Sequence, residues 1–73
     1  MADDMSSEVR YEIGADASAD DHDGRIVLEM ARVLLRYGEP ITAVKLTESL
    51  AWQPVRIVRC IELLLRSGAF REV

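Results

Sequence analysis

Apolar residues recur every three or four positions over residues 54–67, which is the period of an α-helix with one buried face. On a helical wheel, that face would hold Ile57, Val58, Ile61, Leu64 and Leu65. Pro54 suits the first turn of a helix, and Gly68 suits the left-handed residue that follows the last turn. The pattern therefore predicts a helix from Pro54 to Ser67.

A shorter amphipathic segment comes before this helix. Pro40 breaks the preceding segment, and Thr42 is suited to cap a helix that continues to about Leu50. The apolar positions of this helix are Val44, Leu46 and Leu50. Residues 51–53 are left for a tight turn. Two short helices joined in this way form a helix-turn-helix.

A longer helix is predicted from Gly24 to Tyr37, because Asp23 can cap its start and residues 38–40 must end it. Its apolar side chains are Ile26, Val27, Leu28, Met30, Ala31, Val33, Leu34 and Leu35. This band is wider than one packed face needs, so we expect part of it to contact another chain. The chain of 73 residues can build one three-helix core. The expected fold is mainly α, with residues 24–73 as the helix-turn-helix domain.

Residues 24–70 resemble the helix-turn-helix of the winged-helix superfamily, found in many small bacterial and archaeal transcription regulators. The matching residues are Pro40, Ile41, Thr42, Leu46, Thr47, Leu50, Ala51, Gly68, Ala69 and Phe70. Ala51 stands where that family often has glycine, and Gln53-Pro54 stand where a serine cap and a polar residue are common. The resemblance implies a winged-helix-like fold that binds DNA, with residues 54–67 as the recognition helix.

The two ends of the chain predict a short two-stranded β ribbon. Residues 8–13 alternate polar and apolar side chains, and residues 69–73 suffice for one short strand but leave no room for a wing hairpin. An isolated ribbon is marginal in water, so we expect these strands to pack on the helices or to be exchanged in a homodimer. The alternative is that residues 1–13 form a disordered tail.

The side of helix 54–67 opposite its apolar face carries Arg56, Arg59, Leu63 and Arg66. Arg56 and Arg59 lie in the N-terminal half, the part that a recognition helix presents to base edges. Because an arginine can donate two parallel hydrogen bonds to guanine, these two are the predicted base contacts. Lys45 and Arg66 are the predicted phosphate contacts. The alternative is that the arginines only form the solvated side of an amphipathic helix.

Charge divides the chain into two parts. Residues 1–23 hold eight acidic side chains and one arginine, a net charge of −7, whereas residues 24–73 are net +3. We expect the acidic segment to be partly disordered, with residues 14–23 as a linker. The whole chain is net −4, which weakens long-range attraction to phosphates and argues against DNA binding. Consecutive ligands such as Asp20 to Asp23 rarely converge on one ion, so no metal site is predicted.

The chain has few side chains of the types that act in catalysis. His22 and Cys60 are the only histidine and cysteine, and no glycine-rich phosphate loop or metal-ligand spacing occurs, so we expect a binding protein without cofactor and not an enzyme. A single cysteine fits a reducing cytoplasm. The N-terminus lacks a signal pattern and no apolar run is long enough to span a membrane, so we expect a cytoplasmic protein.

Two hypotheses about function remain. In the first, the chain is a DNA-binding transcription regulator, acting as a homodimer on double-stranded DNA. In the second, the same fold is a protein-interaction or assembly module that does not bind DNA. Its possible interface residues are Leu28, Leu35, Trp52 and Leu63. We expect Trp52 either to close the core between the two short helices or to anchor a protein partner.

Overall fold

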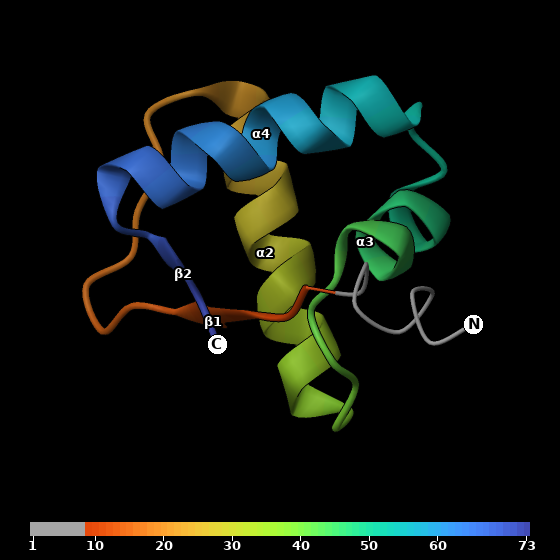
Figure 1. The fold of residues 1–73 in the computed structure, drawn as a ribbon, viewed down its shortest axis with the longest axis horizontal. Coiled ribbons are helices and arrows are strands. Elements are labelled where there is room, and N and C mark those ends of the chain that lie inside the picture. The colour runs from red at the N-terminus through yellow and green to blue at the C-terminus, as the bar shows by residue number, and fades with distance from the viewer. Residues whose placement is uncertain (1–8) are drawn as a thin grey trace.

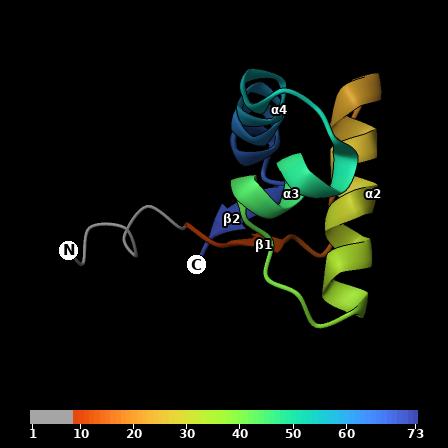
Figure 2. The same cartoon turned by 90° about the vertical axis from the view of Figure 1, so that its right-hand side faces the viewer.

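The computed structural model describes residues 9–73, in which three helices and two short strands follow one another (Figure 1). The elements are β1 (Tyr11–Ile13), α2 (His22–Arg36), α3 (Ala43–Leu50), α4 (Pro54–Ser67) and β2 (Phe70–Glu72). The predicted mainly helical fold, a three-helix core with a short ribbon, is confirmed. α2 forms one side of the molecule, and α3, α4 and the ribbon lie along the other (Figure 2). No helix within residues 9–73 has the length and apolar character needed to cross a membrane.

The core lies where the three helices and β2 meet. Its buried side chains are Val27, Leu28, Ala31, Leu34, Ile41, Leu46, Ile57, Cys60, Ile61, Leu64, Ala69 and Phe70. α4 has the predicted bounds, with Pro54 in its first turn and Gly68 in the left-handed conformation after it. Its predicted buried face needs one correction: Val58 is 46 % exposed, whereas Cys60 is only 3 % exposed. α4 packs against α2, α3 and β2 together, and these contacts turn its buried face away from Val58.

α2 begins two residues earlier than predicted and ends one residue earlier. Its N-cap is Asp21, whose Oδ2 accepts a hydrogen bond from the backbone N–H of Gly24 at 3.1 Å. Asp23 was the predicted cap, but its carboxylate is instead turned toward α4. At the other end, Tyr37 follows the last helical residue and is not part of the helix.

α3 has the predicted start and end. The Oγ1 of Thr42 accepts a hydrogen bond from the backbone N–H of Lys45 at 3.1 Å, which satisfies one of the free donors of the first turn. Leu46 is buried as expected, but Val44 is exposed because it lies on the side of α3 turned away from the core. Ala51 ends the helix in the left-handed region, with φ of 57°.

The ribbon joins the two ends of the described chain. β1 and β2 are antiparallel, with Ile13 opposite Phe70 and Tyr11 opposite Glu72. The strand predicted for residues 8–13 is shorter: residues 9 and 10 lie outside it, and Glu8 lies outside the described residues. Phe70 anchors the ribbon to the helices, so the two strands pack on the core of their own chain.

The loop between β1 and α2, which was predicted as a linker, lies against α2. Ala17 and Ala19 pack on the core, and their carbonyl oxygens accept hydrogen bonds from arginines of α2. Arg32 Nη2 donates to Ala17 at 3.1 Å, and Arg25 Nε donates to Ala19 at 2.9 Å. These contacts hold the loop against α2.

Candidate functional site

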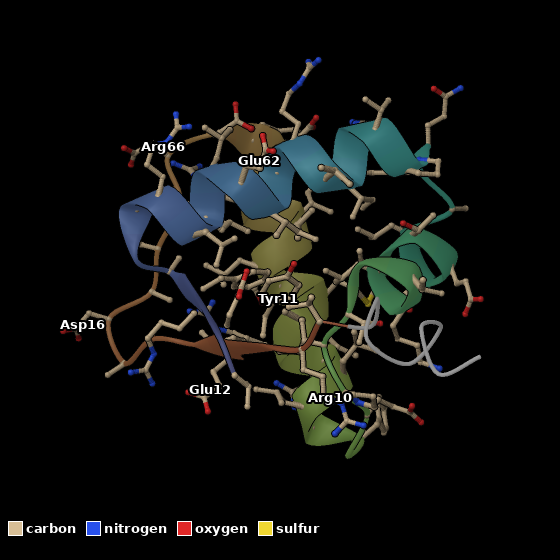
Figure 3. All side chains as sticks on the ribbon, in the orientation of Figure 1. Arg10, Tyr11, Glu12, Asp16, Glu62 and Arg66 are labelled. Carbon is tan, nitrogen blue, oxygen red and sulfur yellow. The ribbon has the colours of Figure 1, made fainter. Side chains whose placement is uncertain are left out.

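The candidate site is the outer face of α4, the part of the helix turned away from the core. Because Ile57, Ile61 and Leu64 point inward, the side chains between them point outward. The outer face consists of Val55, Arg56, Val58, Arg59, Glu62, Leu63 and Arg66, all of them exposed. Figure 3 shows Glu62 and Arg66 on the exposed side of the helix.

Arg56 is the most strongly held side chain of this face. Its Nε donates to Oδ2 of Asp23, and its Nη2 donates to Oδ1, both at 2.9 Å. The pair joins the first turn of α4 to the first turn of α2. The hydrogen bond from Arg56 holds the pKa of the Asp23 carboxyl below its usual value, and the same bond raises the pKa of the guanidinium. Arg56 is nevertheless 47 % exposed, so one part of the group still faces solvent.

Trp52 lies against the guanidinium of Arg56. The Cζ atom of Arg56 is 3.7 Å from the centre of the indole ring, which is a cation–π contact. Trp52 also packs against the core from the turn between α3 and α4. This position agrees with the expectation that its ring closes the core between the two short helices. Its ring therefore connects the turn to the first turn of α4.

The other predicted DNA contacts lie apart from this cluster. Arg59 is exposed one turn along α4, and Arg66 is exposed about 15 Å from Arg56 along the helix axis, at a rise of about 1.5 Å per residue. No ion pair of Arg59 or Arg66 occurs among residues 9–73. Lys45, on α3, lies 3.4 Å from the carboxylate of Glu39.

The predicted interface residues do not form one surface. Leu28 is only 3 % exposed and belongs to the core, so its assignment to an interface is corrected. Leu35 is exposed on the last turn of α2, at the end that points away from α4 (Figure 1). Leu63 lines a cavity of about 490 Å³ between residues 14–21 and the C-terminal end of α4.

Cys60 and two of the consecutive aspartates have structural surroundings in the described residues. Cys60 is buried, and burial raises the pKa of its thiol, which keeps it in the unreactive protonated form. Within residues 9–73, no group of three or more histidine, cysteine or acidic side chains is placed to hold a metal ion. Asp21 and Asp23, two of the four consecutive candidates, are used as a helix cap and as the partner of Arg56.

Sequence reasoning missed the contact of Arg56 with Asp23, which lies 33 residues earlier in the chain. An acidic residue at the start of one helix and an aromatic residue in a turn are common, and neither indicates a shared partner. Comparisons of the chain with protein-family models, with curated proteins and with solved structures found no match. The winged-helix resemblance therefore stays a prediction from the residues themselves.

Proposed function

We propose that this chain binds double-stranded DNA with the outer face of α4 in the major groove and acts as a transcription regulator. The observation that carries the proposal is that α3, the turn and α4 form a packed pair of helices in which the outer face of α4 is exposed and carries arginines. Two of them, Arg56 and Arg59, lie in the half of the helix that enters the groove in helix-turn-helix proteins.

Each side chain of the outer face has a role in the proposed complex. Arg56 and Arg59 contact base edges, and Arg66 contacts a phosphate farther along the groove. Lys45 contacts a phosphate from α3, which requires that it exchange Glu39 for the DNA backbone. Val55, which is 63 % exposed, is suited to contact the methyl group of a thymine.

The net charge of the chain predicts the strength and the sequence preference of this binding. The net charge of −4 opposes approach to any duplex, and Glu62 lies in the middle of the outer face. Non-specific binding should therefore be weak, and affinity should come from a preferred sequence. The proposal includes the expected homodimer and a cytoplasmic location.

The test is a fluorescence titration of a labelled mixed-sequence duplex at about 50 and 200 mM salt, with the mass of the protein measured in parallel. Binding to this duplex should weaken with salt. On a duplex then selected from a random pool, Arg59→Ala should weaken binding by roughly 5- to 150-fold, because it removes the contact with a guanine. Arg36→Ala is the matched control, since Arg36 is exposed at the end of α2 that points away from α4 (Figure 1). Equal affinities of the two variants would contradict the proposal.

One observation favours a second function, that of a protein-interaction module. Val55 and Val58 are both exposed on the same face as Glu62, and valine and glutamate do not attract phosphates. A folded protein that binds no duplex even at low salt would favour this second function. Val58→Asp would then be the variant expected to abolish the protein complex, because it places a charge in the apolar part of the face.

A further inference from the structure

The guanidinium of Arg56 is hydrogen-bonded along one edge and covered on one flat face by an indole ring. A second edge has no hydrogen-bond partner among residues 9–73. We propose that Asp23 and Trp52 position Arg56 to read a guanine, with the Nη1 and Nη2 edge of the guanidinium donating to O6 and N7 of the base. This inference rests on the proposed DNA binding and adds to it two positioning residues, neither of which touches the DNA, and a base type.

The hydrogen-bonding edges of the guanidinium carry the argument. The group has five N–H donors in a planar fork. Asp23 accepts one from Nε and one from Nη2, which together make up the side edge. The end edge consists of Nη1 and the second N–H of Nη2, and it has no hydrogen-bond partner among residues 9–73. Two parallel donors of this kind are what guanine O6 and N7 accept. The carboxylate and the base therefore occupy different edges and do not compete.

Trp52 completes the arrangement by covering one flat face of the guanidinium at 3.7 Å. The indole and the carboxylate together fix the plane and the rotation of the group. A flexible arginine loses this freedom only when it binds, whereas here the fold has already restricted it. A side chain held in this way should discriminate between bases more strongly than a free one. Arg59 provides the comparison, because it has no ion-pair partner among the described residues.

The test measures discrimination and not affinity alone. A duplex is first selected from a random pool with the unaltered protein, and each guanine in it is then replaced by 7-deazaguanine, which lacks the N7 acceptor. At least one replacement should weaken binding, and Arg56→Ala should remove the difference at one of these positions, because alanine has no N–H donor for the base. Asp23→Asn and Trp52→Leu should each reduce the ratio of the two affinities toward one, from an expected value of roughly 5 to 150.

Removal of any negative charge favours DNA in general, so Asp16→Asn is the matched control and should leave the ratio unchanged. A ratio that Asp23→Asn leaves unchanged or raises would overturn the positioning role. A ratio that survives Arg56→Ala at every guanine would assign the base contacts to other residues and would overturn this inference while DNA binding stood. Absence of any salt-dependent binding by the unaltered protein would overturn both. Circular dichroism of each variant confirms that the comparison is between folded proteins.

Discussion

The ring of Tyr11 stacks on the ring of Phe70, with 5.7 Å between the ring centres and 21° between the ring planes. Tyr11 belongs to β1 and Phe70 to β2, so this contact joins the two ends of the described chain. Phe70 is also one of the most deeply buried side chains of the core. The contact therefore holds the ribbon against the helical core to which α4 belongs.

Phe70→Ala should lower the free energy of unfolding by about 3–5 kcal/mol, because it removes a large buried ring and leaves a cavity. That is a large part of the stability expected of a domain of this size. Urea denaturation followed by circular dichroism measures the change. Tyr37→Ala is the control, since Tyr37 is 75 % exposed and its loss should change stability by less than about 0.5 kcal/mol. Similar effects of the two variants would contradict the role of Phe70.

Thr42→Ala should destabilise the fold by about 1 kcal/mol, because it removes the oxygen that caps α3. Thr42→Ser keeps the oxygen and should recover most of the loss. Thr47→Ala is the contrasting variant: the Thr47 hydroxyl donates to the carbonyl of Ala43 within the helix and caps nothing. Thermal unfolding should place Thr47→Ala near the unaltered protein, and a loss as large as that of Thr42→Ala would contradict the assignment.

Ala51→Gly should raise stability by about 0.5–1 kcal/mol, since Ala51 has a φ of 57° that glycine adopts without strain. Gly68→Ala should have the opposite sign. An added Cβ at Gly68 would meet no described atom within 4 Å, so its cost comes from the φ of 87° alone. Urea midpoints of the two variants should therefore lie on opposite sides of that of the unaltered protein. Midpoints that shift in the same direction would show that backbone strain does not govern these turns.

The Asp23–Arg56 pair predicts a dependence of stability on acid. The pKa of Asp23 is lower in the folded chain than its unfolded value of about 3.9, because Arg56 donates to the charged carboxylate. The stabilisation is therefore complete above about pH 4 and is lost as the pH falls through the folded pKa. Titration of the carboxyl carbon by NMR measures this pKa directly. Arg56→Gln should return the pKa toward its unfolded value, and a pKa that does not move would contradict the pairing.

The helices were predictable because local signals decide their ends. Pro54 and Gly68 bound α4, and Thr42 caps α3, each through contacts within a few residues. The start of α2 was not predictable in the same way, since Asp21 and Asp23 are both suitable caps. The carboxylate of Asp23 binds Arg56 instead of capping the helix, and this contact depends on how α2 packs against α4. The residues near Asp23 in the sequence do not indicate this packing.

The site was predictable only as a set of exposed side chains. The wheel placed Arg56, Arg59 and Arg66 on the outer side of α4, and the structure has all three there. The helical wheel placed Val58 on the buried face of α4 and did not include Cys60 in it. The direction of this face depends on three neighbouring elements at once, which the wheel does not contain. The restraint of Arg56 by Trp52 and Asp23 is likewise a property of the tertiary fold.

DNA binding by the outer face of α4 is tested most directly by an NMR titration of the labelled protein with a short duplex at low salt, following the backbone amides and the Trp52 indole. We expect the largest shifts on residues 52–66, with Arg59 among them, and no shifts in the last turn of α2 or in the loop at residues 14–19. Shifts confined to those other segments, or no shifts at all from a folded protein, would contradict DNA binding by the outer face of α4.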